Sequence, residues 1–291
     1  MVKKYSELYL EARRSFLAVE DVPTASLYAR ILLSKATGKR TEELLANSEL
    51  YASEEACMFV EDGVRRLMAG EPAAYVLGEW DFHGMRLLVT PDVLIPRDDT
   101  CAVTDLAISH ALFLGQAPRI LDLCTGSGCI GLAIAKSVPD ARVTLADISR
   151  EAAAVAKQNI ILQKASAHVS CVIADALDVP KPFLGKFDMI VSNPPYITGE
   201  EMKELPDSVK NFEPHLALYG GEDGLDFYRA IAQNYRMALK PGGLLCFEFG
   251  MGQGDDICRI LEENGYTVLE RTRDYSQIER AVIAQYGRKE D

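Results

Sequence analysis

Residues 120–131 read Ile-Leu-Asp-Leu-Cys-Thr-Gly-Ser-Gly-Cys-Ile-Gly, and this stretch decides the fold. The apolar run at its start predicts a buried strand, and the apolar residues from Ile130 to Ser137 predict a helix. Between them lie Gly126 and Gly128, followed by Gly131. Glycines at this spacing let the backbone turn sharply and let a ligand come close to the peptide groups. The pattern therefore predicts a strand, a ligand-binding loop and a helix in succession.

An acidic residue follows at the place where such folds hold a ribose. A second strand is predicted over residues 143–147 and ends on Asp147, whose carboxylate can accept hydrogen bonds from both ribose hydroxyls of an adenosine. The spacing Gly126-x-Gly128-x-x-Gly131 also belongs to dinucleotide-binding loops. The loop and Asp147 therefore indicate an adenosine-containing cofactor and leave its identity open. Asp175, after a third predicted strand over residues 169–173, fits either an adenine contact or a place on the surface.

Strands and helices continue to alternate on the C-terminal side of this loop. We expect a helix from Ser149, its capping residue, to Leu162, and further helices over residues 225–239 and 257–265. The other predicted strands cover residues 187–191, 244–247, 266–269 and 281–285. This alternation predicts an α/β domain with a mostly parallel sheet and helices on both faces. We place this domain at residues 98–291, with a first helix from about Asp99 to Leu114.

The N-terminal part of the chain has a purely helical pattern. Apolar residues recur at helical spacing at Leu8, Phe16, Leu17, Leu27, Ile31 and Leu32. Further helices are expected to start at Thr41 and after Ser53, which can cap a helix, and the last one stops near Gly70. These helices predict a small bundle domain over residues 1–72. Residues 73–97 are expected to link the two domains as a β-hairpin, with strands at 75–77 and 85–89 around a turn at Gly84.

Composition narrows the classes of function. The formal net charge of −12 disfavours a broad electrostatic grip on nucleic-acid phosphates. The cysteines form no CxxC pair and the histidines have no metal-binding spacing, so we expect reduced cysteines and no metal site. The first residues do not suit a signal peptide, and no apolar run has membrane-spanning length. The sequence therefore predicts a cytoplasmic protein without a membrane partner.

The tetrapeptide Asn193-Pro194-Pro195-Tyr196, after the fourth predicted strand, indicates the chemistry. Ligands bind beyond the carboxyl ends of the strands in an open α/β sheet, so Asn193 is expected beside the cofactor. The two prolines fix their φ angles and lack N–H groups, which makes the turn stiff. The Asn193 side-chain oxygen and the Pro194 carbonyl can then accept both hydrogens of one –NH2 group, and Tyr196 can stack on it.

A held –NH2 group suits methyl transfer to a planar amide or amino nitrogen. Holding both hydrogens aims the nitrogen lone pair at a sulfonium methyl group, so positioning and hydrogen-bond polarisation carry most of the catalysis. A hydride-transfer enzyme does not need this tetrapeptide. The residues therefore favour a methyltransferase that uses S-adenosylmethionine, and by themselves they do not distinguish a glutamine amide from an adenine amino group.

The chain resembles the release factor glutamine methyltransferase family, the PrmC/HemK type, over nearly its whole length. The matching stretches are residues 70–78, 93–100, 121–131, 193–196, 212–218, 220–225, 248–250 and 253–254. The resemblance implies a helical N-terminal domain that helps to dock a protein substrate, and a C-terminal class I (Rossmann-like) methyltransferase domain. It also implies S-adenosylmethionine-dependent methylation of the glutamine side-chain amide in the Gly-Gly-Gln loop of peptide chain release factors.

The resemblance also implies roles for individual residues. The cofactor-binding set is Cys124, Thr125, Gly126, Ser127, Gly128, Asp147, Ala176 and Asn193. In this set Asp147 holds the ribose and Ala176 lies beside the adenine. The substrate glutamine is gripped by Asn193, Pro194, Pro195 and Tyr196, and the catalytic residues are Asn193, Pro194 and Tyr196. The chain departs from the family pattern at Cys124, Ala176, Asp98 and Cys101, which affects secondary contacts.

Two other functions stay open at this point. A nucleic-acid adenine amino-methyltransferase shares the tetrapeptide, although the acidic charge and the lack of a recognisable DNA-reading domain disfavour it. A non-catalytic cofactor-binding protein is disfavoured by the presence of Asn193. We therefore predict a release factor as the partner and no direct binding of nucleic acid.

Overall fold

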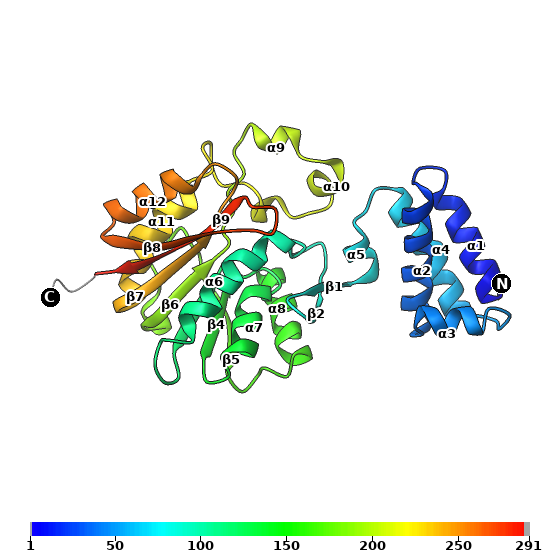
Figure 1. Cartoon of the computed structure of the whole chain (residues 1–291), viewed down its shortest axis with the longest axis horizontal. Coiled ribbons are helices and arrows are strands. Elements are labelled where there is room, and N and C mark those ends of the chain that lie inside the picture. Colours follow the sequence, from blue (N-terminus) through cyan, green and yellow to red (C-terminus); the bar gives the residue numbers. More distant parts are fainter. Residues whose placement is uncertain (1, 288–291) are drawn as a thin grey trace. The chain divides into compact units, whose positions relative to one another are not determined.

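A computed structural model describes residues 2–287 of the chain (Figure 1). These residues divide into two compact units. The first comprises residues up to Gly78 together with 207–212, and the second comprises residues 79–206 and those from Glu213 onward. The predicted domains, residues 1–72, 73–97 and 98–291, differ from these two units in their ranges and remain our proposal.

The first unit is the predicted bundle of helices. Its helices are α1 (Tyr5–Phe16), α2 (Val22–Thr37), α3 (Thr41–Ala46), α4 (Glu54–Met68), α5 (Ala73–Leu77) and α10 (Asp207–Lys210). The side chain of Asp21 caps α2 by accepting the N–H of Thr24. Ser53 caps α4 in the same way by accepting the N–H of Ala56, as predicted.

Small side chains contribute more to the core of this bundle than the sequence indicated. Leu8 is buried, whereas Leu17 and Leu27, which the helical spacing placed on the same apolar faces, are exposed. Ala25 and Ala29 on α2 are fully buried instead. Small residues allow two helices to approach closely, and α2 packs against both α1 and α4.

The strand predicted at residues 75–77 is wrong, because these residues form the last turn of α5. Pro72 stands directly before this helix, and Gly78 ends it in the left-handed conformation at a φ of 70°. Two alanines at its start favour the helix. The hairpin lies further along the chain: β1 (Glu79–Phe82) pairs antiparallel with β2 (Met85–Leu88), around the predicted turn at Gly84.

The second unit is built on a seven-stranded sheet with the order β5-β4-β3-β6-β7-β9-β8. The strands are β3 (Arg119–Leu123), β4 (Arg142–Asp147), β5 (Val169–Ile173), β6 (Phe187–Ser192), β7 (Leu239–Glu248), β8 (Tyr266–Arg273) and β9 (Glu279–Tyr286). The strands from β5 to β7 in this order are parallel, and β9 runs antiparallel to both β7 and β8. The predicted α/β class with a mostly parallel sheet is confirmed.

Helices cover both faces of this sheet (Figure 1). One face packs against α6 (Cys101–Ala111), α7 (Cys129–Ser137) and α8 (Arg150–Leu162), and the other against α11 (Asp226–Asn234) and α12 (Gly254–Glu263). Successive strand residues face opposite sides, so Ile120 joins the first core and Leu121 the second. The remaining short helices are α9 (Glu201–Glu204), η1 (Asp98–Thr100), η2 (Pro182–Leu184), η3 (His215–Ala217) and η4 (Tyr235–Ala238).

The connection from α11 to β7 differs from the prediction. The α-helix expected to reach Leu239 ends at Asn234 and is followed by η4. Residues 241–243, expected as a turn before a strand, lie inside β7 at an irregularity, where Phe187 pairs with Leu239 and Met189 with Leu244. Proline is tolerated at such a bulge because it gives up no ladder hydrogen bond there.

Candidate functional site

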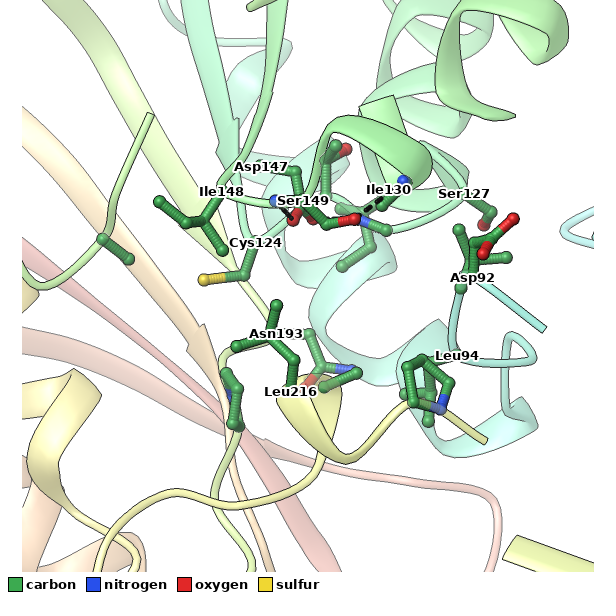
Figure 2. A pocket seen from close by; sticks show the side chains of 18 of the residues that line it. Asp92, Leu94, Cys124, Ser127, Ile130, Asp147, Ile148, Ser149, Asn193 and Leu216 are labelled. Carbon is green, nitrogen blue, oxygen red and sulfur yellow. Dashed lines mark hydrogen bonds between the residues drawn. The ribbon is translucent and has the colours of Figure 1, made fainter. Parts of the chain in front are cut away.

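A cavity of about 210 Å³ lies at the carboxyl ends of β3, β4, β5 and β6 (Figure 2). Segments that follow these strands form its wall: residues 124–127, 147–149 and 174–177, together with Asn193 and Pro195. Two further loops contribute residues between 92 and 96 and between 214 and 217. Parallel strands bring their carboxyl ends to one edge of the sheet, and the cavity lies where this rule predicts a ligand.

The glycine-rich loop makes the sharp turn that the sequence predicts. Gly126 and Gly128 have φ angles of 53° and 85°, a left-handed region that favours glycine. A Cβ atom built on Gly126 would meet no atom within 4 Å, so the space beside this residue is open. A Cβ atom on Gly131 would overlap the side chain of Leu145, so the first turn of α7 needs glycine to pack on β4.

Asp122, near the end of β3, anchors the glycine-rich loop through hydrogen bonds. Its Oδ2 accepts hydrogen bonds from the hydroxyl of Thr125 at 2.6 Å and from the N–H of Gly131 at 2.8 Å. The side chain is fully buried, and burial raises the pKa of this carboxyl to about 7. Sequence reasoning assigned this residue no role, although an acid inside a buried strand was a usable signal.

Asp147 ends β4 with its carboxylate on the cavity wall (Figure 2). Its Oδ2 accepts the N–H of Gly126 at 2.9 Å, and its Oδ1 accepts the N–H of Ser149 at 3.0 Å. Burial raises the pKa of Asp147, while these backbone N–H groups lower it. A carboxylate oxygen can accept more than one hydrogen bond, so Asp147 retains capacity for two ribose hydroxyls. Ala176, predicted beside the adenine, and Asp175 lie on the same cavity wall.

The tetrapeptide contributes two of its residues to the cavity. Asn193 and Pro195 line it, whereas Pro194 and Tyr196 do not. The Nδ2 of Asn193 lies 3.5 Å from the Oγ1 of Thr100, which also lines the cavity. Tyr196 packs against the core on the α11 and α12 side of the sheet, and burial raises its pKa, which keeps it a neutral phenol. The structure brings these residues to one edge of the sheet, and their roles remain predictions.

Comparisons with known proteins give the chain a family. The PrmC N-terminal domain family matches residues 9–78, and the methyltransferase small domain family matches residues 104–211. A release factor glutamine methyltransferase of Clostridium acetobutylicum is 37% identical over 259 residues, which cover 89% of this chain and 90% of the relative. One of Geobacter sulfurreducens is 36% identical over 280 residues, which cover 96% and 95%. The chain belongs to the release factor glutamine methyltransferase family.

Family membership confirms the predicted class I methyltransferase fold. A methyltransferase structure from Pyrococcus furiosus agrees in fold, with a TM-score of 0.52 and 18% identity over 78% of this chain and 99% of that one. As a member of the release factor glutamine methyltransferase family, the protein is a methyltransferase with S-adenosylmethionine as its methyl donor, as predicted.

The cavity fits the cofactor of this methyltransferase family. The buried Oγ of Ser127 lines the cavity and has no hydrogen-bond partner within residues 2–287, so it can bond to a polar group of a ligand. Asp147 offers acceptors for ribose hydroxyls, and Ile148, Leu177 and Phe227 add apolar wall. Of the predicted cofactor-binding residues, Gly128 alone is absent from the cavity wall. Its left-handed backbone forms the turn before α7, where a Cβ atom would meet Leu145.

The two loops beside the cavity were absent from the predicted site of this methyltransferase. Glu213, almost fully buried, joins them, because it forms an ion pair with Arg97 and its Oε2 accepts the N–H of Ile95 at 3.2 Å. Leu94 from one loop and Leu216 from the other lie on the cavity wall (Figure 2). The signal was present in the stretches 93–100 and 212–218, which match the family pattern.

Proposed function

We propose that this protein transfers the methyl group of S-adenosylmethionine to the side-chain amide nitrogen of the glutamine in the Gly-Gly-Gln loop of peptide chain release factors. The observation that carries the proposal is the position of Asn193, which lies on the wall of the cavity that also contains Asp147 and the glycine-rich loop. The relatives from C. acetobutylicum and G. sulfurreducens are named for this activity and match most of the chain.

Residues 193–196 can orient and polarise the glutamine amide nitrogen, which is a poor nucleophile. An amide nitrogen is weakly nucleophilic because its lone pair is delocalised into the carbonyl group. The Oδ1 of Asn193 and the carbonyl of Pro194 accept hydrogen bonds from the two N–H groups of the glutamine amide. These hydrogen bonds turn the amide nitrogen toward the methyl group and increase the electron density on that nitrogen. The rigid prolines keep both acceptors in place. Stacking of Tyr196 on the flat amide group stays a prediction, because its ring packs against the core and does not line the cavity.

The partner in this proposal is a protein. A net charge of −12 disfavours binding to nucleic-acid phosphates, so an adenine substrate in DNA or RNA fits the chain less well. The helical unit that matches the PrmC N-terminal domain helps to dock the release factor. Because release factors act in translation, the proposal places the enzyme in the cytoplasm.

The membrane has no part in the proposal. Within residues 2–287, no helix combines the length and the apolar character needed to cross a bilayer.

Transfer of labelled methyl groups tests the proposal. The full-length protein should label a purified release factor in the presence of S-adenosylmethionine, and a Gln→Ala change in the Gly-Gly-Gln loop of that factor should abolish the label. Asn193→Ala should lower kcat on the order of 100-fold, because it removes one of two acceptors for the reacting amide. Asn264→Ala, whose side chain bonds only within the end of α12, is the matched control. Label that survives the Gln→Ala change contradicts the proposal, and labelled adenine in oligonucleotides would support the alternative substrate.

A further inference from the structure

Glu248 is a buried acid that the proposed reaction leaves without a role. It is the last residue of β7, and its side chain is almost completely buried, with 1% of the residue exposed. Its Oε2 has no hydrogen-bond partner within residues 2–287. A buried carboxyl oxygen without a hydrogen-bond partner is destabilising, so its presence calls for an explanation.

The fold places this acid directly behind Asn193. β6 and β7 are neighbouring parallel strands in which Ser192 pairs with Phe247, so the next residue of each strand, Asn193 and Glu248, stand side by side. The side chains of Asn193 and Thr100 lie close enough to the Glu248 carboxyl to lower its pKa. The hydroxyl of Tyr228 donates to the Glu248 carbonyl at 2.8 Å, which anchors the end of the strand.

An asparagine amide needs such an anchor to act as an acceptor. Its oxygen and its NH2 group have nearly the same shape, but only the oxygen can accept an N–H of the substrate. A carboxylate only accepts hydrogen bonds, and the Oγ1 of Thr100 lies within 3.5 Å of the Asn193 Nδ2. The carboxylate therefore favours the orientation in which the NH2 group points back into the protein and Oδ1 faces the cavity, and the Thr100 hydroxyl, which can accept as well as donate, is compatible with it.

We infer that Glu248 is a positioning residue of this methyltransferase, whose carboxylate holds the NH2 group of Asn193 and so turns Asn193 Oδ1 toward the substrate amide. The identity of that amide rests on the proposed function, whereas the neighbouring positions of Glu248 and Asn193 follow from the register of β6 and β7. Glu248 does not line the cavity, so it acts on the substrate only through Asn193.

The protonation state of Glu248 makes this role sensitive to pH. Burial raises the pKa of Glu248 to about 8, while Thr100, Arg280 and Asn193 lower it. The other titratable groups around it are Arg280, which is paired with Asp99 and Asp274, and Tyr196, Tyr228, Cys101 and Cys129. Burial raises the pKa of these tyrosines and cysteines, so they stay neutral where Glu248 ionises. Protonated Glu248 can donate to Asn193 Oδ1 and favour the wrong orientation, so kcat should rise with pH as Glu248 ionises.

Kinetics of full-length variants test the role. Glu248→Ala should lower kcat on the order of 100-fold, with KM for the release factor and the Kd of S-adenosylhomocysteine changed less than about 3-fold, because binding groups stay in place. Glu248→Gln can still present an oxygen to Asn193, so it should retain more activity than Glu248→Ala, without the rise in kcat with pH. Glu270→Gln, an exposed acid paired with His110, is the matched control and should keep the wild-type profile. Wild-type kcat and pH dependence in Glu248→Gln and Glu248→Ala would overturn the inference.

A measurement on the side chain itself separates this inference from the proposed substrate. In protein labelled with ¹⁵N-asparagine, the side-chain NH2 signal of Asn193 can be assigned by its loss in Asn193→Ala. It should move with pH in the wild type as Glu248 titrates, and this movement should vanish in Glu248→Gln. A signal that ignores both changes overturns the inference. If the signal responds as expected but no release factor is methylated, the proposed substrate fails and the positioning role stands.

Discussion

The side chain of Asn159 joins two segments that are far apart in the sequence, and Asn159→Ala removes that connection. Asn159 lies on α8 and is fully buried. Its Oδ1 accepts the N–H of Leu88 at 2.7 Å, and its Nδ2 donates to the carbonyls of Leu88 and Ser127, both at 2.9 Å. One amide therefore ties the end of the β1–β2 hairpin to the loop that lines the cofactor cavity.

The expected loss follows from these three hydrogen bonds. Each contributes about 1 to 1.5 kcal/mol to the free energy of unfolding, so their removal should cost roughly 3 to 5 kcal/mol. The lower end applies if water reaches the freed groups of Leu88, which is only partly buried. Ser127 is buried more deeply, so loss of the hydrogen bond to its carbonyl should also displace the cofactor loop. We expect this displacement to weaken binding of S-adenosylhomocysteine on the order of 10-fold, equivalent to about 1.4 kcal/mol.

Urea unfolding followed by tryptophan fluorescence measures this effect. Trp80 is the only tryptophan of the chain and pairs with Leu87 inside the hairpin, so its signal reports on the second unit. Titration calorimetry with S-adenosylhomocysteine gives the change in affinity. Asn264→Ala, which loses one hydrogen bond to the carbonyl of Ile260, is the control and should cost about 1 kcal/mol or less. A loss below about 1 kcal/mol in Asn159→Ala, with unchanged affinity, would refute the reasoning.

Three other substitutions probe the cofactor site. Asp147→Ala should weaken S-adenosylhomocysteine binding at least about 10-fold in calorimetry, because the ribose and the N–H of Gly126 lose their acceptor, and unaltered affinity would count against the ribose role. Cys124 has a φ of 60°, so Cys124→Gly should be more stable than Cys124→Ala by about 1 kcal/mol in urea unfolding, and equal midpoints would contradict this strain. The pKa of Asp122 is raised from 3.8 to about 7 by burial, so between these values the unfolded chain binds fewer protons and stability falls as pH rises. Asp122→Asn should lack this part of the fall, as urea midpoints at pH 5 and pH 7.5 can show, and identical pH dependence would contradict the shifted pKa.

Elements could be predicted from the sequence where local chemistry decides them. Ser149 was expected to cap α8, and its side chain accepts the N–H of Ala152 at 3.0 Å. The strand expected at residues 75–77 failed for a local reason too, because Pro72 and Gly78 delimit a short helix that the apolar pattern does not reveal. The ends of elements also depend on tertiary packing, as the bulge inside β7 shows.

The cofactor half of the site was more predictable than the loops around it. Cys124, Asp147 and Asn193 each stand at or directly after the end of a parallel strand, so their common edge follows from the sheet alone. The loops at residues 92–96 and 214–217 are joined at the cavity by Glu213, which pairs with Arg97 and accepts the N–H of Ile95. That pairing joins segments without periodicity, and no local rule brings them together.

Glu248 shows why strand order is the information that a single sequence lacks. The run Leu244–Phe247 predicts a buried strand, but no periodicity says which strand lies beside it. An acid at its end therefore suggests the start of an exposed loop. Only when β6 and β7 lie side by side, with Thr100 and Arg280 close to its carboxyl, does Glu248 become a buried group behind Asn193. Buried acids with raised pKa values are common at functional sites. Glu248 is such an acid, and it lies next to Asn193, which we propose to bind the reacting amide.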